Sequence, residues 1–398
     1  MNIWLIIILL FGIASTSRTV ILTISLLSGF IIILGLIKKI SSKTAIVSTL
    51  AVLIIGLGIV QLAEGRNLRN IISAPPTPPF HTDMITYLNT LYKIRSGENF
   101  YEAFSESVKS EMNSLPAEIW AWKQPLIFYL FKFFPGGSMS VIYLAIFNFS
   151  LVLLSSYFIG RKFLTPVSAL ICPFLIWPYF TYPLIEQTIM QVEWWGLSFL
   201  IFGLLCYFYD KKLLCGIMLA LSLSSRELFI IPIAFLIFVD LFNKKFTPTI
   251  KLILPIIFIF LPLYIAHLYQ ISNYQNPYLL TLSSFRKNSL SGWEMVRPAL
   301  AYNSWSYALT NIRPFLILII LNTTLLVIKI IREKKVFDLI LISSFLPFFI
   351  ISFKLGSDPW HDYWGIYYIP LVLLVTPISV MYIPKLRFLL PKEQKTTI

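Results

Sequence analysis

The sequence predicts an all-α, polytopic membrane protein with about 11–13 transmembrane helices and a large first outer loop that carries amphipathic surface helices. Three observations lead to this fold class. Hydrophobic residues make up 57% of the 398 residues and charged residues only 13%, whereas a soluble domain has about 25% charged residues. The apolar runs approach the roughly 20 residues that span a bilayer. Lys and Arg collect in alternate loops between the runs. This composition excludes disordered chains, collagen and soluble coiled coils.

The expected spans follow the apolar runs in chain order. Several runs are short or contain proline, and the closely spaced runs 213–225 and 228–242 leave open whether they form one broken span or two. The first run lacks a charged leading region and a small-residue cleavage site, so we interpret it as a membrane segment and not as a signal peptide. The runs fall at about 2–16, 19–37, 45–63, 138–160, 163–180, 194–209, 213–225, 228–242, 250–272, 313–331, 337–353 and 364–383.

The loop charges predict the orientation. With the N-terminus in the cytoplasm, the inner connections carry 18 of the 32 Lys and Arg residues and five of the 18 Asp and Glu residues. The net charge of +14 is then almost wholly cytoplasmic, as the positive-inside rule requires. These cations are dispersed over short turns and form no basic stripe, which excludes a nucleic-acid partner. We therefore expect a multi-pass protein of the plasma (cytoplasmic) membrane with both termini inside.

Polar residues collect in the segments that this orientation places outside. The longest runs from residue 64 to about 135, which is far longer than a connection needs to be. Further polar stretches occupy 273–312, 354–364 and 186–193. A channel or carrier would more naturally place ionisable groups near the midplane of the membrane. Acids at the outer interface instead suit the head group of a lipid-linked substrate.

The first outer loop begins with a stiff extended segment at Pro75–Pro79. A helical pattern follows Asp83, with apolar residues at Met84, Tyr87, Leu88 and Leu91. One interpretation makes Asp83 the cap or a first-turn residue of this helix, and the other gives it a chemical role.

The second half of this loop predicts another helix. Phe100, Phe104, Val108 and Met112 recur at a spacing of four, which indicates an amphipathic helix lying on the outer leaflet. Trp120 to Pro125 then reads as an interfacial aromatic belt, and Leu126 to Phe134 as a segment that re-enters the membrane.

Five short motifs in a fixed order carry a resemblance to a known family. The chain resembles the C-type (GT-C) glycosyltransferases, which use polyprenyl-phosphate-linked sugars. The nearest branch contains the dolichyl-phosphate-mannose protein mannosyltransferases and the bacterial aminoarabinose transferase of lipid A. The resemblance covers roughly residues 45 to 385. The motifs are His81-Thr82-Asp83 with Tyr87, Lys123-Gln124-Pro125-Leu126, Glu193-Trp194-Trp195-Gly196-Leu197, Gly216 to Ala220 running into Ser225-Arg226-Glu227, and His361-Asp362-Tyr363 through Pro370.

The resemblance implies a domain organisation. Residues 45–385 would form a GT-C-like transmembrane catalytic domain that includes the outer loop 64–135. Residues 1–44 would form an N-terminal transmembrane hairpin, and residues 386–398 a basic cytoplasmic tail. The chain departs from the family pattern at Met84, Gln124 and Arg226, where members often carry a second acid, a proline and a lysine.

The resemblance also implies an enzyme. It would move a sugar from a polyprenyl-phosphate donor to a hydroxyl of a lipid, glycan or protein acceptor, in the manner of a mannosyltransferase, with its active site on the outer face of the membrane. Such a transfer needs a base at the acceptor hydroxyl and cations at the departing phosphate. Asp83 is the candidate base, and a single base without a protein nucleophile predicts inversion at the anomeric carbon. The alternatives are a transporter or flippase of lipid-linked saccharides and a polysaccharide polymerase or ligase.

Several residues are candidates for binding the donor phosphate. Each has a structural alternative: Glu193 as an interfacial acid beside Trp194, Arg226 as a helix-end cation paired with Glu227, and the loop arginines as solvated residues. Arginine suits phosphate because its guanidinium presents a fork of donors. The expected donor-binding set is Glu193, Arg226, Arg297, His361 and Tyr363, with Arg286, Lys287 and Arg313 as further cations.

A divalent metal is a further expectation. His81 and Asp83 could share an ion with His361, and the donor types accept Mg, Mn or Zn without selecting among them. We interpret His267, on an apolar run, as structural. The chain has no Walker loop or GxGxxG motif, so direct use of a nucleotide is not expected.

Overall fold

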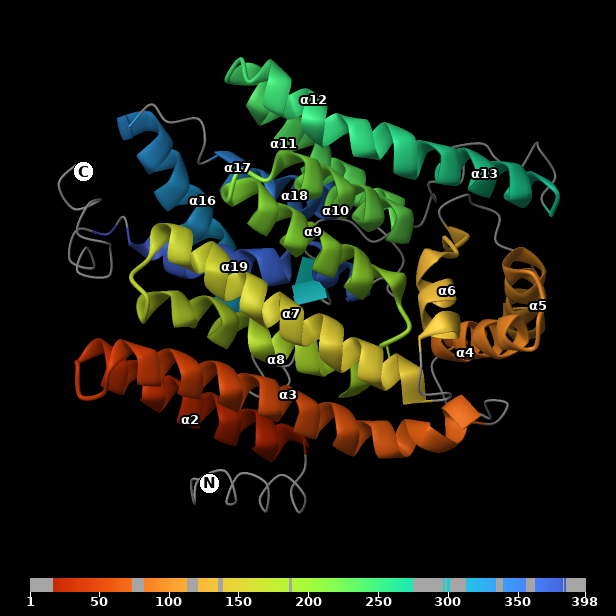
Figure 1. The fold of residues 1–398 in the computed structure, drawn as a ribbon, viewed down its shortest axis with the longest axis horizontal. Coiled ribbons are helices and arrows are strands. Elements are labelled where there is room, and N and C mark those ends of the chain that lie inside the picture. The colour runs from red at the N-terminus through yellow and green to blue at the C-terminus, as the bar shows by residue number, and fades with distance from the viewer. Residues whose placement is uncertain are drawn as a thin grey trace.

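The computed structural model describes residues 17–73, 82–112, 121–134, 139–185, 188–274, 296–297, 299–300, 313–333, 339–355, 362–381 and 383. Every regular element among them is helical, which confirms the all-α class (Figure 1). Five of these helices are long and apolar enough to cross a membrane, which indicates a multi-pass membrane protein. The five segments are Thr19–Leu36, Ser42–Leu62, Ser140–Phe163, Phe246–Ser272 and Pro314–Arg332.

The helix bounds follow the apolar runs closely. The first half of the chain contains α2 (Ser17–Leu36), α3 (Ser42–Ser73), α4 (Thr82–Arg95), α5 (Phe100–Met112), α6 (Leu126–Phe133), α7 (Ser140–Phe163), α8 (Ile171–Ile185) and α9 (Val192–Phe208). The second half contains α10 (Lys212–Ser225), η4 (Glu227–Phe229), α11 (Ile230–Phe242), α12 (Phe246–Pro255), α13 (Leu261–Ser272), α16 (Arg313–Glu333), α17 (Leu339–Ser343), α18 (Leu346–Leu355), η9 (Asp362–Tyr367) and α19 (Ile369–Val380).

The helices form a bundle around α7, α8, α9, α10 and α19 (Figure 1). The hairpin of α2 and α3 packs along one side, against α7 and α8. A short π-helical turn at Ile256–Phe260 joins α12 and α13, which run as one long rod along another side (Figure 1). Only 17% of that rod is buried in the protein, so most of its apolar surface is available to lipid.

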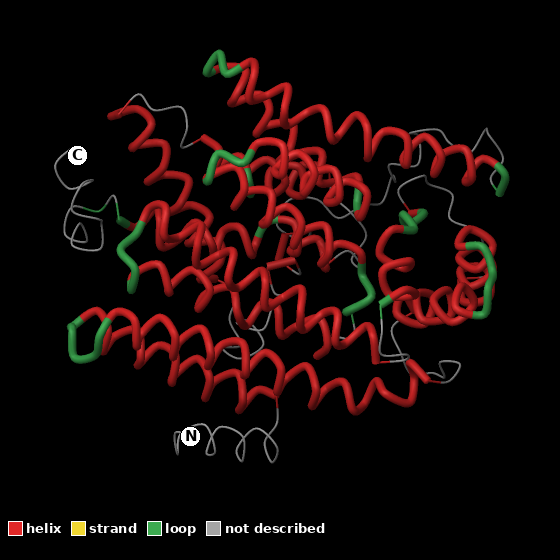
Figure 2. The backbone as a smooth tube through the Cα atoms, viewed as in Figure 1, coloured by secondary structure: helices red, strands yellow, loops and turns green. Residues whose placement is uncertain are grey.

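The turns between helices gather at two opposite ends of the bundle (Figure 2). One end, here called the cationic end, holds the turns 37–41, 164–167, 209–211 and 243–245, which carry or adjoin most of the described lysines. The other, here called the surface-helix end, holds α4, α5 and α6 together with the turn 188–191. Lys38, Asp210 and Lys244 take left-handed backbone angles at three turns of the cationic end, with φ of 57°, 59° and 58°.

The structure decides between the two interpretations of runs 213–225 and 228–242. The Lys212 Nζ atom, at the start of α10, lies 3.6 Å from the Asp240 Oδ2 atom, near the end of α11. The two helices therefore run antiparallel as a hairpin and do not form one broken span. Arg226 makes the corner in extended conformation, with φ −155° and ψ 114°.

Two apolar runs differ from the helices that the structure contains. Helix α3 continues to Ser73, ten residues beyond the apolar run. The segment Leu126–Phe134 contains α6, which has eight residues and is about 12 Å long, and its re-entry into the membrane stays a prediction. The run 337–353 divides into α17 and α18, separated at residues 344–345.

Helix α5 forms as predicted, but its apolar side faces protein and not lipid. Phe100, Phe104 and Val108 are buried, and the Phe104 ring lies 5.6 Å from that of Trp122. Glu102 and Glu106, on the opposite side, are exposed. The spacing of four correctly predicted which face of α5 is buried. It did not show whether protein or lipid covers that face.

Candidate active site

Helix α4 places Asp83 at the surface-helix end. Its apolar positions Met84, Tyr87, Leu88 and Leu91 are buried, and they hold the helix against α5 and α6. Asp83 lies in the first turn, where a negative charge is favoured by the helix dipole. Its side chain is partly exposed, and its carboxylate makes no ion pair with any residue that the structure describes.

Lys123 comes from the segment between α5 and α6 and points into the protein. It is only 6% exposed, and its Nζ atom lies 3.1 Å from the Glu193 Oε1 atom. The same ammonium is 5.9 Å from the ring centres of both Tyr87 and Tyr363. Trp122 is also fully buried, so the interpretation of residues 120–125 as an interfacial belt is wrong for these two residues.

Glu193 stands in the first turn of α9 and is fully buried. Its Oε1 atom contacts two cations, Lys123 and the Arg226 Nε atom, the latter at 3.0 Å. Its Oε2 atom has no hydrogen-bond partner among the described residues. One carboxylate thus holds two cations from different parts of the chain and keeps one oxygen free.

Arg226 is 3% exposed at the corner between α10 and η4. Its Nη1 atom lies 3.0 Å from Glu227 Oε1, and its Nε atom lies 3.2 Å from the Tyr367 hydroxyl. Arg226 therefore contacts Glu227 and Glu193 at the same time. Lys123, Glu193, Arg226, Glu227 and Tyr367 are here called the buried ion cluster.

Gln124 fixes one edge of the buried ion cluster. Its Nε2 atom donates to the Leu223 carbonyl at 2.9 Å and to Glu227 Oε2 at 3.1 Å. These bonds tie the loop before α6 to the end of α10. Gln124 thus has a defined structural role.

Two buried tyrosines connect Asp83 with the cluster. Burial raises the pKa of Tyr87, and the charges of Asp83 and Glu193 raise it further. Burial also raises the pKa of Tyr363, with Glu193 and then Asp83 adding to the effect. The charges of Asp83 and Glu193 thus act on the same two tyrosines, and both hydroxyls stay protonated.

Comparisons with protein-family models, with curated proteins and with solved structures find no match for this chain.

The structure brings four of the predicted site residues together and leaves others aside. Asp83, Glu193, Arg226 and Tyr363 meet at one end of the bundle. Arg297 is exposed and forms no ion pair with the described part of the chain. His81, His361, Arg286 and Lys287 lie outside the described residues, as does the Arg313 side chain.

The predicted metal set of His81, Asp83 and His361 is consequently not tested. Within the described ranges, no group of three His, Cys, Asp or Glu residues could hold a metal ion. The Nδ1 atom of His267 lies 3.0 Å from the Tyr101 hydroxyl. This contact agrees with the interpretation of His267 as a structural residue. Cys172, Cys206 and Cys215 are free.

Sequence reasoning missed the part that Lys123 and Tyr367 play in the site. Lys123 belonged to a motif of the resemblance but had no assigned role. The available indication of a role for Lys123 was its position between a tryptophan and Gln124-Pro125, away from the cationic loops. Tyr367 offered none, because it is one of several aromatic residues in an apolar run.

Proposed function

We propose that this protein is an integral-membrane glycosyltransferase of GT-C type that moves a sugar from a polyprenyl-phosphate donor to an acceptor hydroxyl at the outer face of the plasma membrane. One observation carries the proposal. The Asp83 carboxylate, which has no ion-pair partner in the described part of the chain, lies at the same end of the bundle as two buried cations, Lys123 and Arg226, which share Glu193. Base and phosphate-binding groups are the two parts that the transfer requires.

The proposed reaction is a single displacement. The acceptor oxygen forms a bond to the anomeric carbon while its proton passes to the Asp83 carboxylate. The bond between that carbon and the phosphate oxygen breaks, and the polyprenyl phosphate leaves with the electron pair. Attack from the face opposite the phosphate inverts the anomeric centre.

Lys123 and Arg226 would stabilise the negative charge that grows on the departing phosphate. Buried cations act strongly in such a role because little water screens them. Glu193 holds both cations in place before the donor arrives, which lowers the cost of organising them during the reaction. No step is assigned to a divalent metal.

The positions of the buried charges favour an enzyme over a carrier. Among the described residues, the buried ion pairs lie at the two ends of the bundle: Lys123, Glu193 and Arg226 at one end, Lys212 and Asp240 at the other. Secondary transporters usually place substrate-binding charges near the midplane.

The proposal includes about 11–13 spans, cytoplasmic termini and a cytoplasmic cationic end, in line with the positive-inside rule.

The test uses purified full-length protein in lipid nanodiscs with a panel of radiolabelled polyprenyl-phosphate sugars. Transfer is measured as label that leaves the lipid fraction, with water and simple alcohols as acceptors. Asp83→Asn should lower transfer by about 10²–10⁴-fold, the usual contribution of a general base. Glu102→Gln, which neutralises an exposed acid on α5, should leave it unchanged.

Two results would contradict the proposal. One is full transfer by Asp83→Asn, which would remove the base. The other is the absence of release from every donor by the wild-type protein. A parallel assay with a chelator tests the expected Mg, Mn or Zn ion separately.

A further inference from the structure

A second polar site lies at the cationic end, far from the buried ion cluster. Helices α10 and α12 pack against each other and begin beside one another, at Lys212 and Phe246. Neither first turn has a side-chain cap, because Lys211 and Lys245 stand at the capping positions. The first N–H groups of each helix lack partners within the helix and attract anions.

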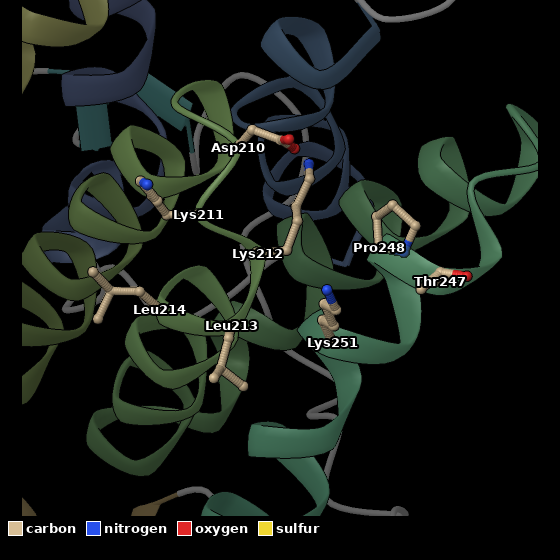
Figure 3. A pocket seen from close by; sticks show the side chains of 8 residues that line it. All are labelled: Asp210, Lys211, Lys212, Leu213, Leu214, Thr247, Pro248 and Lys251. Atoms are coloured by element: carbon tan, nitrogen blue, oxygen red, sulfur yellow. The ribbon is translucent and has the colours of Figure 1, made fainter.

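An open cavity of about 420 Å³ lies between these two helix starts (Figure 3). Figure 3 shows Lys251 on α12 beside the start of α10, Lys212 extending from the start of α10 toward the side on which Asp210 lies, and Lys211 directed away from both. Three lysines and one acid are among the lining residues. Lys212 is paired with the buried Asp240, so the accessible cation of the cavity is Lys251. The lining residues are Asp210, Lys211, Lys212, Leu213, Leu214, Thr247, Pro248 and Lys251.

The base of the cavity is held by a buried ion pair. Lys212 is 8% exposed; its Nζ atom lies 3.6 Å from Asp240 Oδ2 and 3.0 Å from the centre of the Tyr207 ring. The Tyr207 hydroxyl donates to Asp240 Oδ1. Asp240 thus fixes the position of Lys212.

Lys251 is the cation that a ligand can reach. It is exposed on α12 and forms no ion pair with the described part of the chain. The cavity therefore offers an accessible ammonium group and the Thr247 hydroxyl next to two uncapped helix starts.

The surroundings of the cavity are those of a lipid-facing surface. Leu213 and Leu214, at its edge, are 55% and 45% exposed, and Ile250 on α12 is 56% exposed. Helix α12 belongs to a segment long and apolar enough to cross a membrane. Acyl chains can therefore lie along α12 while a head group occupies the cavity.

We propose that this cavity binds the phosphate group of an anionic membrane phospholipid in the leaflet at the cationic end. Basic pockets between membrane helices on the cytoplasmic side recognise such head groups. The chemistry of the cavity would also accept a soluble phosphate, but the exposed leucines favour a ligand that carries acyl chains. The site is independent of the proposed sugar transfer at the opposite end.

The experiment compares three probes on delipidated full-length protein in neutral detergent: dihexanoyl phosphatidylglycerol, dihexanoyl phosphatidylcholine and inorganic phosphate. Binding is followed by thermal unfolding and by a direct titration. Phosphatidylglycerol should stabilise the protein, and phosphatidylcholine should not. Lys251→Gln should weaken phosphatidylglycerol binding about 5-fold, the effect of one lysine at a membrane surface.

Lys39→Gln is the matched control, because it removes an exposed lysine from another turn of the same end. It should leave the affinity unchanged. The proposal is overturned if phosphatidylcholine binds equally well, if Lys251→Gln and Lys39→Gln have the same effect, or if inorganic phosphate binds as tightly as phosphatidylglycerol. Lys251 is exposed, so its substitution leaves the buried Lys212–Asp240 pair intact and the protein folded.

Discussion

The Lys123 Nζ atom lies 3.1 Å from the Glu193 Oε1 atom, and both side chains are buried. This ion pair joins the loop before α6 to the first turn of α9. Removing two opposite charges from water costs several kcal/mol per ion, and the pair is retained only because the charges satisfy each other. Each partner therefore depends on the other, and on Arg226, to remain buried.

The first prediction concerns this pair. Lys123→Met leaves Glu193 with Arg226 as its one remaining cation, and it should lower the free energy of unfolding by about 3–5 kcal/mol, the usual cost of breaking a buried pair. The measurement is thermal or denaturant unfolding in detergent. Adding Glu193→Gln to Lys123→Met should recover part of the loss, since the uncompensated charge is gone. Equal stability of wild type and Lys123→Met would show that the pair does not form.

The second prediction concerns the hydrogen bond from the Arg226 Nε atom to the Tyr367 hydroxyl, at 3.2 Å. Tyr367→Phe keeps the ring and removes one acceptor of a charged donor. It should cost about 1.5–3 kcal/mol of unfolding free energy. Tyr92→Phe, on the exposed side of α4, is the control and should have no effect. If both variants unfold alike, Tyr367 does not hold Arg226.

The helices could be predicted from the sequence because lipid imposes a simple rule: apolar runs of sufficient length become helices. The rule fails where the environment is protein. In Leu126–Phe134, Ile127, Phe128 and Phe131 pack in the core, whereas Phe133 is 75% exposed. Helix α5 is amphipathic because Trp122 and its neighbours cover its apolar face. Neither pattern distinguishes a lipid partner from a protein partner.

The candidate site could be predicted only in part. Arg226 was identifiable because a charge at membrane depth needs a reason to be there, whereas Asp83 and Glu193 were identified through motifs of the resemblance. Lys123 lacked a role because nothing in its local sequence reveals that Glu193, 70 positions later, would meet it. Ion pairs between distant residues depend on how the helices pack, and helix packing cannot be predicted from a single sequence.

The third prediction compares two lysines of the cavity at the cationic end. Lys212→Met leaves Asp240 buried without its cation and should lower the unfolding free energy by about 3–5 kcal/mol. Lys251→Gln changes an exposed side chain and should stay within about 0.5 kcal/mol of wild type. Unfolding of both variants in lipid-free detergent checks the contrast. A similar loss in the two variants would mean that Lys212 is not held as the structure places it.

The fourth prediction concerns the contact of α10 with α12. A methyl group at Gly216 would meet the Leu252 carbonyl oxygen, which is backbone and cannot turn aside, and Pro255 at 2.9 Å. Gly216→Ala should therefore push the helices apart and cost about 1–3 kcal/mol.

Gly58→Ala provides the matched control for Gly216, because nothing lies within 4 Å of a methyl group at that position of α3. It should be neutral or stabilise the protein by up to about 1 kcal/mol, since alanine favours helix more than glycine does. Loss of phosphatidylglycerol binding in Gly216→Ala alone would link the helix contact to the cavity. Equal stability of the two variants would contradict the close approach of α10 to α12.

The fifth prediction concerns orientation in the membrane. The positive-inside rule assigns the turn around Lys39 to the cytoplasm and α5 to the opposite side. Cysteine introduced at Lys39 or at Glu102, both exposed, should react differently with a membrane-impermeant maleimide added to intact cells. In a background with Cys172, Cys206 and Cys215 replaced by serine or alanine, only the Glu102→Cys protein should be labelled. After the membrane is permeabilised, both should be labelled.

The reverse pattern would place Asp83 and the buried ion cluster on the cytoplasmic side, where the proposed transfer could not use a donor in the outer leaflet. It would also move the cavity at Lys251 away from the cytoplasmic leaflet.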